Sequence, residues 1–205
     1  MWVEWIQSAN LIFLLFGIIF LFAASFVICM IFKALKRRWM FRWFPLPWSR
    51  VKSWECLACG ECCKEFDILL GPDEHANIVK IYGEDVTRRV VNKFYLKRRS
   101  NGTCLFLYKH NRIWLCKLQH MKPRACKLYP FEVYHSPKFG NSTEAIYRYG
   151  DKEFFVYVYP MCMGLRWGKP TPEYAQKTIP EFIEIAEGLQ QEQKYSTAKL
   201  FSHTQ

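Results

Sequence analysis

The chain has 205 residues, of which 51% are hydrophobic and 23% are charged. This composition excludes a disordered protein and allows one globular domain with one additional segment. The formal net charge is +11, but seven of the Lys and Arg residues lie between Lys33 and Lys52. Because much of the positive charge is local, it argues against a nucleic-acid-binding surface, and we expect no nucleic-acid partner.

Residues 11–32 contain no charged residue and no proline. A helix of this length is about 33 Å long, at roughly 1.5 Å per residue, and the hydrocarbon core of a bilayer is about 30 Å thick. The run therefore predicts one transmembrane helix, with the lipid bilayer as a partner. A buried core helix and a cleaved signal peptide are the alternatives, but a signal peptide has its basic residues before the apolar run, whereas here they follow it.

The flanking charges predict the orientation of this helix. Glu4 precedes the apolar run, no Lys or Arg does, and the seven basic residues follow it. The positive-inside rule then places residues 1–10 on the extracytoplasmic side and the C-terminal domain in the cytoplasm, as in a single-pass protein of the cell membrane. Residues 33–53 are predicted to form a basic, aromatic juxtamembrane linker whose tryptophans suit headgroup depth.

The rest of the chain divides into a cysteine-rich domain, residues 54–195, and a polar tail, residues 196–205. Mixed hydrophobic patterns predict a small α+β domain. Thr178 and Glu181 fit a capping box at the start of the last predicted helix. In chain order, the expected elements are helices over 72–82 and 84–97, a hairpin formed by 104–108 and 112–116, strands over 131–135, 145–149 and 154–159, and a helix that begins at 179.

The densest chemical signal is the run Cys56-Leu57-Ala58-Cys59-Gly60-Glu61-Cys62-Cys63. A Cys-x-x-Cys turn places two sulfurs on the same side of a tight loop, which suits a tetrahedral ion or a cluster iron. Gly60 permits the backbone conformation that brings Cys62 to the same point. The spacing of the first three cysteines also matches a bacterial ferredoxin loop.

Four further cysteines follow the run, so that eight thiols lie in the domain. The candidate metal and cofactor ligands are Cys56, Cys59, Cys62, Cys63, Cys104, Cys116, Cys126 and Cys162. Soft thiolates select zinc, Cu(I) or an iron-sulfur cluster. Adjacent residues of an extended chain point to opposite sides, so Cys62 and Cys63 are not expected to bind one mononuclear ion together. Two zinc sites, a four-iron cluster with four other thiols, and a multinuclear site all satisfy this count.

Disulfide bonds are the main alternative to metal binding. They require the opposite membrane orientation, because the cytoplasm keeps thiols reduced. The five histidines show no regular metal spacing. Lys122, Arg124 and Lys127 surround Cys126 and either lower its thiol pKa or are ordinary loop charges. The sequence contains no phosphate-binding loop, dinucleotide fingerprint or helical zinc-protease motif.

The order and spacing of these landmarks match a known family. The landmarks are Cys56, Cys59, Cys62 and Cys63, then Cys104-Leu105-Phe106-Leu107, Cys116, Pro123 with Cys126, Tyr129-Pro130-Phe131 and Cys162-Met163-Gly164. Through them the domain resembles the YkgJ-type cysteine-cluster family, a zinc- or iron-chelating CxxCxxCC domain. The resemblance implies a metal or cluster held by these cysteines. Lys122 departs from the family pattern, which has arginine before the proline, so the charge is retained but the bidentate fork is lost.

The leading hypothesis is a membrane-anchored cytosolic protein that binds zinc or an iron-sulfur cluster through eight cysteines. It serves electron transfer or sensing, with a membrane or redox protein as its partner. A flagellin lysine N-methylase is similar through the same type of cluster, which implies a second hypothesis, a cluster-dependent protein-modifying enzyme. The third is a structural zinc module for a membrane partner. Whether the protein is an enzyme stays open at this point, as do the metal and the grouping of the cysteines.

Overall fold

The computed structural model describes residues 44–195, together with Ser25, Val27 and Met30. Contacts divide the chain into two units, Met1–Phe44 and Pro45–Gln205. The second unit contains short helices and antiparallel strands, which confirms the α+β class of the domain. It also carries all eight cysteines of the predicted centre, so its fold positions the site.

The predicted transmembrane helix, residues 11–32, lies outside the described residues except for Ser25, Val27 and Met30, which are helical. Among the described residues, no helix is both long and apolar enough to cross a membrane. The longest of them, α3 (Pro72–Tyr82), has 11 residues and a length of about 16 Å, roughly half of a bilayer core. The single-pass fold class and the cell-membrane localisation are therefore corrected, and the supported fold class is the α+β domain alone.

Residues 45–53, assigned above to a linker, belong to the second unit. They form strand β1 (Leu46–Pro47), a 3-10 turn η1 (Trp48–Arg50) and most of strand β2 (Val51–Trp54). Trp48 donates a hydrogen bond from Nε1 to the carbonyl oxygen of Ile146 at 3.1 Å, and Val51 is fully buried. The folded domain therefore begins near Pro45 rather than at residue 54.

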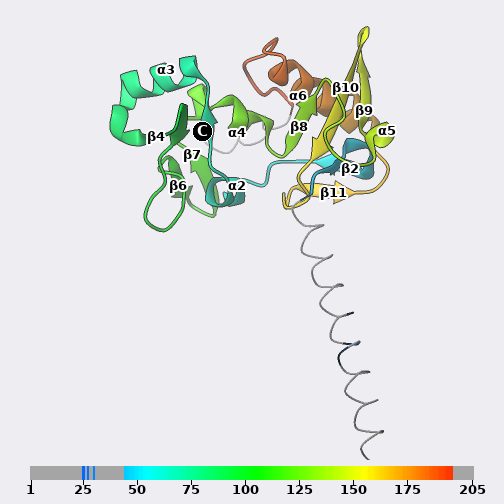
Figure 1. Ribbon diagram of the computed structural model, residues 1–205, viewed down its shortest axis with the longest axis horizontal. Coiled ribbons are helices and arrows are strands. Elements are labelled where there is room, and N and C mark those ends of the chain that lie inside the picture. The colour runs from blue at the N-terminus through cyan, green and yellow to red at the C-terminus, as the bar shows by residue number, and fades with distance from the viewer. Residues whose placement is uncertain (1–24, 26, 28–29, 31–43, 196–205) are drawn as a thin grey trace, which may run out of the picture. The chain divides into compact units, whose positions relative to one another are not determined.

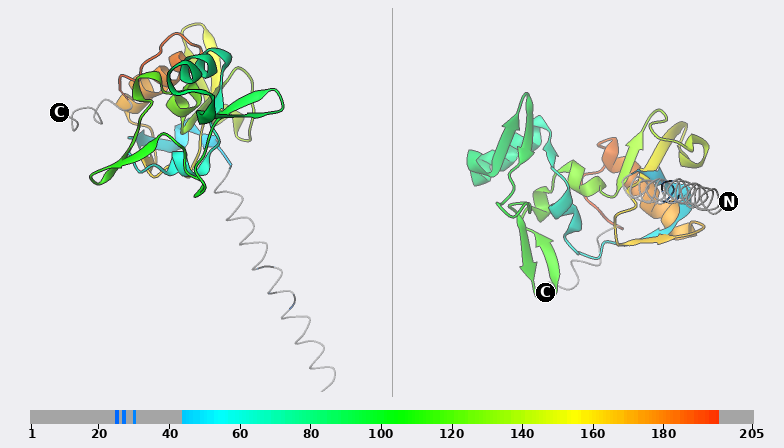
Figure 2. Two further views of the ribbon diagram at one scale, coloured as in Figure 1. Left: turned by 90° about the vertical axis from the view of Figure 1, so that its left-hand side faces the viewer. Right: turned by 60° about the horizontal axis from the view of Figure 1, so that its bottom comes forward.

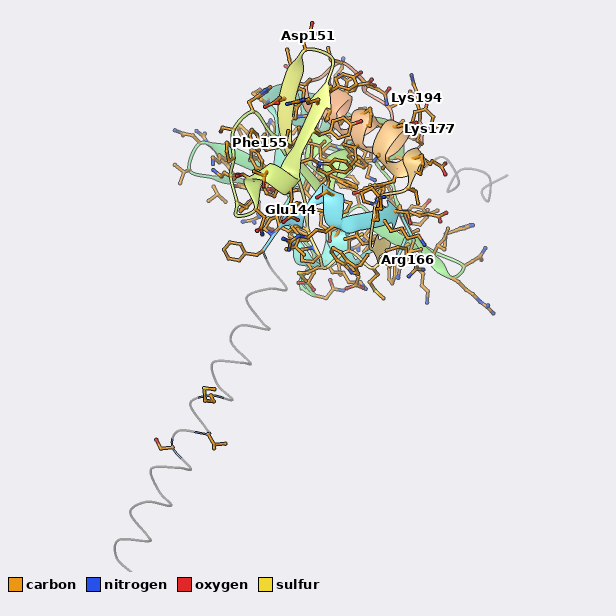
Figure 3. All side chains as sticks on the ribbon, turned by 90° about the vertical axis from the view of Figure 1, so that its right-hand side faces the viewer. Glu144, Asp151, Phe155, Arg166, Lys177 and Lys194 are labelled. Atoms are coloured by element: carbon orange, nitrogen blue, oxygen red, sulfur yellow. The ribbon has the colours of Figure 1, made fainter. Side chains whose placement is uncertain are left out.

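A four-stranded antiparallel sheet supports the first hydrophobic core. Its central strand is β10 (Lys152–Val158), which pairs with β8 (Phe131–Tyr134) along one edge and with β9 (Ile146–Tyr149) and β1 along the other. A short helix, α5 (Ser142–Ala145), leads into β9. Asp151 lies at the tip of the hairpin between β9 and β10 (Figure 3).

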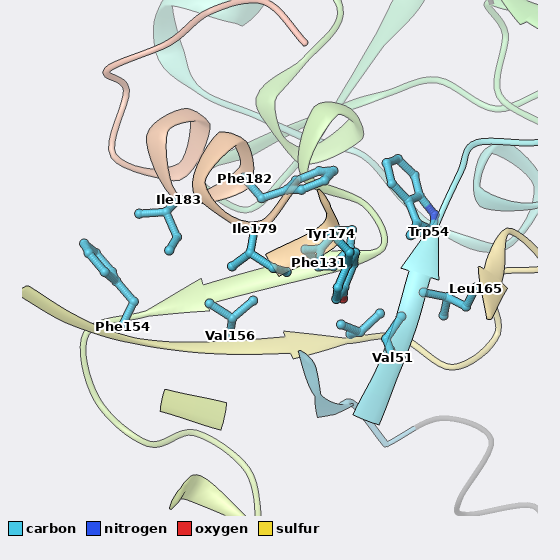
Figure 4. Packing of buried hydrophobic residues seen from close by; sticks show 11 residues of the cluster. Val51, Trp54, Phe131, Phe154, Val156, Leu165, Tyr174, Ile179, Phe182 and Ile183 are labelled. Carbon is cyan, nitrogen blue, oxygen red and sulfur yellow. The ribbon is translucent and has the colours of Figure 1, made fainter. Parts of the chain in front are cut away.

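Two joined helical segments cover this sheet. The π-helical turn η4 (Tyr174–Thr178) runs directly into α6 (Ile179–Ala186), and the apolar side chains of α6 face the strands (Figure 4). The rings of Phe131 and Phe182 have centroids 4.1 Å apart. A two-stranded sheet of β2 and β11 (Leu165–Trp167) adjoins them. We call this hydrophobic core core one. Its buried residues are Val51, Trp54, Phe131, Phe154, Val156, Val158, Leu165, Tyr174, Ile179, Phe182 and Ile183.

A second hydrophobic core lies among smaller elements. They are the sheet of β3 (Leu69–Leu70), β5 (Lys93–Leu96) and β4 (Thr87–Val90), the hairpin of β6 (Leu107–His110) and β7 (Ile113–Cys116), and helix α3. Ile78 of α3 is fully buried against them. We call this second core core two. Its buried residues are Ile68, Leu70, Ile78, Leu96, Cys104, Phe106, Leu107 and Leu118.

Three short segments connect the two cores: α2 (Glu61–Glu65), η3 (Gln119–Met121) and α4 (Arg124–Leu128). In Figure 1, α3, β4, β6 and β7 lie on one side of α2 and α4, whereas β2, β8 and β10 lie on the other. The turned view on the right of Figure 2 keeps these two groups of elements apart. The two hydrophobic cores therefore lie on either side of α2 and α4.

Most of the expected elements are present, but one helix is wrong. The helix over 72–82, the three strands and the last helix are confirmed. A hairpin is also present, but its first strand is β6 (Leu107–His110) rather than 104–108. Residues 84–97 form a 3-10 turn, η2 (Glu84–Val86), followed by the hairpin of β4 and β5. β-branched residues favour strands, and β5 gains a second partner in β3, so pairing overrides the helical spacing of the apolar residues.

The predicted capping box at Thr178 is also wrong. Thr178 has helical dihedral angles and no capping hydrogen bond, because η4 extends the helical backbone to its N-terminal side. Glu181 instead accepts hydrogen bonds from the backbone N–H groups of Lys194 and Tyr195, the latter at 3.1 Å. Glu181 therefore secures the chain that follows α6.

Candidate metal centre

The eight cysteines come from six places in the chain. Cys56 and Cys59 lie in the loop after β2, and Cys62 and Cys63 lie in α2. Cys104 pairs with Arg98 in an isolated bridge, Cys116 ends β7, Cys126 lies in α4, and Cys162 lies in the turn between β10 and β11. All eight are free thiols, so the disulfide alternative is not supported.

One cavity of about 450 Å³ is lined by all eight of these cysteines. Residues far apart in the sequence, from Cys56 to Cys162, therefore meet at one place. Trp114, Lys122 and Phe66 are among the other residues of its wall. Sequence reasoning anticipated that these thiols act together, and the fold brings them together.

The Cys-x-x-Cys loop is held against β7. Ala58 and Gly60 both have positive φ, 49° and 74°, which turns the chain sharply between Cys59 and Cys62. The N–H of Trp114 donates to the carbonyl oxygen of Ala58 at 2.8 Å. A Cβ atom on Gly60 would lie 3.0 Å from Cβ and Cγ of Trp114, so only glycine satisfies both the conformation and the close approach.

The Cys162 turn is held against the end of β2. The N–H of Glu55 donates to the carbonyl oxygen of Gly164 at 3.1 Å, and a Cβ atom on Gly164 would lie 2.0 Å from the Glu55 carbonyl oxygen. Trp54, a buried member of core one, donates from Nε1 to Sγ of Cys162 at 3.3 Å. Core one therefore orients this thiol directly.

Backbone hydrogen bonds fix Cys63, Cys104 and Cys116 relative to one another. The N–H of Cys104 donates to the carbonyl oxygen of Cys63 at 2.8 Å. The N–H of Leu107 donates to the carbonyl oxygen of Cys104 at 3.2 Å, and Leu107 lies opposite Cys116 in the β6–β7 ladder. These three cysteines thus share one hydrogen-bonded framework.

Two arginines secure this framework from outside. Arg99 donates from Nη2 to the carbonyl oxygens of Leu105 and Leu107, at 2.6 and 2.7 Å. Arg98 donates to the carbonyl oxygen of Lys64, directly after Cys63. Sequence reasoning missed both residues, because an arginine that caps carbonyls has no motif of its own.

The adjacent thiols of Cys62 and Cys63 lie 3.9 Å apart. The expectation that they point to opposite sides is wrong, because α2 is helical and not extended. A hydrogen bond from Cys63 to a Cys62 thiolate lowers the pKa of Cys62 to about 7 and raises the pKa of Cys63. One proton is therefore shared across the pair.

Burial acts in the opposite sense on five other thiols. It raises the pKa of Cys56, Cys104, Cys116 and Cys126, and it raises the pKa of Cys162 to about 11. The positive charge of Lys122 opposes this effect at four thiols, Cys56, Cys62, Cys116 and Cys126. The site therefore combines desolvated thiols with nearby positive charge, from Lys122 and, at Cys104, from Arg99 and Arg98, and a bound metal must displace protons from it.

The thiols surround the cavity rather than converge on one point. Among the described residues, no three His, Cys, Asp or Glu side chains are grouped closely enough to hold an ion. Eight soft, largely buried donors around a common space nevertheless have the chemistry that zinc or iron requires. The described histidines are absent from the wall of the cavity, as the sequence indicates. His75, for example, stacks on Phe94 with ring centroids 3.8 Å apart, and His203 lies outside the described residues.

The cavity also has an aromatic wall that sequence reasoning treated only as a landmark. Tyr129 and Tyr159 both pack against Phe66, with ring centroids 5.0 and 5.6 Å from it. Glu132 accepts hydrogen bonds from the hydroxyls of Tyr134 and Tyr159, at 2.5 and 2.8 Å. Burial raises the pKa of Tyr129, so its phenol stays neutral beside the thiols.

Residues 55–163 match the CxxCxxCC family, described as a "Putative zinc- or iron-chelating domain". Because the match covers more than half of the chain, the protein belongs to this family. It is a metal-binding protein of the zinc- or iron-chelating class, as the resemblance of its cysteine landmarks implies. No curated protein and no solved structure matches the chain.

Proposed function

We propose that the domain binds iron as iron-sulfur through its eight cysteines, and that the bound iron-sulfur cofactor transfers electrons. The observation that carries the proposal is the single cavity of about 450 Å³ lined by all eight thiols. A cavity of this kind suits a cluster with inorganic sulfide, which fills space between its ligands, better than bare ions, whose ligands meet at one atom. The bound cluster supplies reversible one-electron redox chemistry.

The protein residues contribute burial, charge and orientation to this site. The aromatic wall of Phe66, Tyr129 and Tyr159 limits access of water to the thiols. Lys122 places a positive charge near four thiolates, and Trp54 donates a hydrogen bond to Cys162. Hydrogen bonds and positive charge at sulfur raise the reduction potential of a cluster, whereas burial stabilises the form with the smaller net charge.

Zinc is the second candidate, because four thiolates form a complete tetrahedral site for this ion and the eight thiols around the cavity suffice for two such sites. In that case the metal is structural, because a redox-inactive ion held by thiolates contributes folding energy.

Purification of the full chain under anaerobic conditions, followed by iron, acid-labile sulfide and zinc analysis, separates the two candidates. An iron-sulfur protein contains iron and sulfide in similar amounts, has a broad visible absorbance that bleaches on reduction, and gives an electron paramagnetic resonance signal in one oxidation state. Zinc without sulfide or colour supports the structural candidate. Folded protein with neither metal, after reconstitution with each, contradicts the proposal.

A further inference from the structure

The eight cysteines are not distributed evenly around the cavity. Cys56 and Cys162 pack against core one. Cys104 is a buried member of core two, and three other cysteines pack against that core: Cys63, Cys116 and Cys126. The candidate cysteine ligands are therefore divided between the two cores.

We propose that the cysteines form two four-thiolate centres, one of Cys63, Cys104, Cys116 and Cys126, and one of Cys56, Cys59, Cys62 and Cys162. This inference rests on the proposed binding of a metal by the eight thiols and adds the assignment of each thiol to a centre. The first set is called the core-two centre and the second the core-one centre.

The core-two centre rests on a continuous framework. The N–H of Cys104 donates a hydrogen bond to the carbonyl oxygen of Cys63 at 2.8 Å. Leu107 links Cys104 to Cys116, because it donates to the carbonyl oxygen of Cys104 and pairs with Cys116 in the ladder. Cys126 lies in α4 and packs against the same core. Its thiol interacts electrostatically with those of Cys116 and Cys104, and also with that of Cys62. Together they have the four thiols of a Cys₄ ligand set, which binding of the metal must draw to one point.

The core-one centre uses the Cys-x-x-Cys loop and the Cys162 turn. The thiol of Cys162 interacts with those of Cys56 and Cys59. The backbone hydrogen bond from the N–H of Glu55 to the carbonyl oxygen of Gly164, at 3.1 Å, joins the two segments that carry these three thiols. Three ligands leave one position for a fourth.

Cys62 takes that position. Cys63 packs against core two, whereas Cys62 is not among the described residues that pack against either core, so Cys62 is the thiol left for the fourth position. The two adjacent thiols lie 3.9 Å from each other. Their separation places the two centres side by side in one cavity, with α2 as the element that supplies a ligand to each.

Titration of the metal-free full chain with Co²⁺ under anaerobic conditions tests the division, because tetrahedral cobalt-thiolate sites have intense visible bands. We expect the bands to saturate at about two equivalents in the unmodified protein, one for each Cys₄ set. Cys104→Ser and Cys59→Ser should each halve the signal, and the double variant should abolish it. Cys29→Ser is the control and should retain both equivalents, because Cys29 belongs to neither set.

A measurement on the unmodified chain guards against variants that fail to fold. With one equivalent of Co²⁺, rapid alkylation and mass spectrometry of the intact protein should find molecules with four protected domain thiols. Fragmentation should assign each protected group to one set, with Cys62 and Cys63 protected in different molecules. Protection of Cys63 together with Cys59 in those four-thiol molecules would overturn the division.

The outcomes separate this inference from the proposed function. If the unmodified protein binds neither cobalt, zinc nor iron, the proposed function fails. If it binds metal but both single variants lose the whole signal while retaining their circular dichroism spectra, the division fails and a single centre with eight ligands replaces it. Half-loss in both variants supports the two centres.

Discussion

Gly60 shows how one residue can control the shape of the site. Its φ of 74° and its contact with Trp114 are two separate reasons for the absence of a side chain. Because the residue lies between Cys59 and Cys62, a change in its backbone moves ligands on both sides. Sequence reasoning identified the conformational reason, but the contact with β7 depends on the fold.

We expect Gly60→Ala to lower the free energy of unfolding by about 1–2 kcal/mol from the left-handed backbone, and by more from the contact with Trp114. Thermal unfolding of the metal-loaded chain and its metal content measure the effect. Gly102→Ala has a similar φ of 78° with open space around it, so it isolates the backbone contribution. Gly140→Ala has neither feature and should leave stability unchanged. Equal losses at Gly60 and Gly102 would show that the contact with Trp114 contributes nothing.

Lys122 is the cation whose charge opposes the burial of four of the thiols. We expect Lys122→Met to weaken metal binding roughly tenfold, because about 1.4 kcal/mol of favourable interaction with the thiolates is lost. Competition with a chelator at fixed pH measures the change. Lys122→Arg should retain most of the affinity, since it keeps the charge, and Lys117→Met should have no effect because Lys117 is exposed. An unchanged affinity in Lys122→Met would remove Lys122 from the site.

At the scale of elements, the hairpin of β4 and β5 contains a strained turn. Val91 has φ of 55° and is 84% exposed, so a β-branched residue occupies a left-handed position with little packing in return. Val90 and Val91 lie within residues 84–97, which the sequence predicts to be a helix. Both are exposed in the hairpin.

Val91→Asn is expected to raise the free energy of unfolding by about 1 kcal/mol, because asparagine tolerates left-handed backbone. The hydrogen bond from Arg89 to Val91 uses the carbonyl oxygen and remains. Chemical denaturation of metal-loaded protein provides the comparison. Val90→Asn is the matched control, and it should be neutral or slightly destabilising because Val90 lies in a strand without positive φ. A loss of stability in Val91→Asn would contradict the interpretation of the turn as strained.

The elements also show where local patterns suffice. Helix α3 begins with Pro72 and has Glu74 accepting a hydrogen bond from the N–H of Gly71 at 2.8 Å, so its start is encoded within a few residues. Residues 84–97 have comparable helical spacing, but β5 pairs with Leu69 and Leu70, more than twenty residues earlier. Pairing with a distant segment is not visible in a local pattern.

For the whole molecule, the two cores meet at the metal-binding cavity. Core one holds Cys56 and Cys162, whereas core two holds Cys63, Cys104, Cys116 and Cys126. A metal bound in this cavity therefore stabilises the contact between the cores as well as each ligand loop. Metal binding and the cooperativity of folding should be coupled.

We expect the metal-loaded domain to unfold in a single calorimetric transition and the metal-free domain to unfold in two, at lower temperatures. Phe182→Ala removes a fully buried ring of core one. In the metal-free domain it should lower the free energy of unfolding for one of the two transitions by about 3–5 kcal/mol. Ile78→Ala, in core two, should lower the other transition. If each variant shifts both transitions equally without metal, the cores are one cooperative unit and the metal does not join them.

The sequence by itself determined the chemistry of this protein: eight cysteines in a CxxCxxCC pattern with four later partners define a zinc- or iron-chelating domain, because thiolates are the ligands of these metals. It also determined the elements whose patterns are local, such as α3 and the β6–β7 hairpin. Only the tertiary structure decided that all eight thiols line one cavity, that residues 45–53 belong to the domain, and that 84–97 pairs as strands. Those outcomes depend on contacts between residues far apart in the chain, and the energy of such contacts is absent from any local pattern.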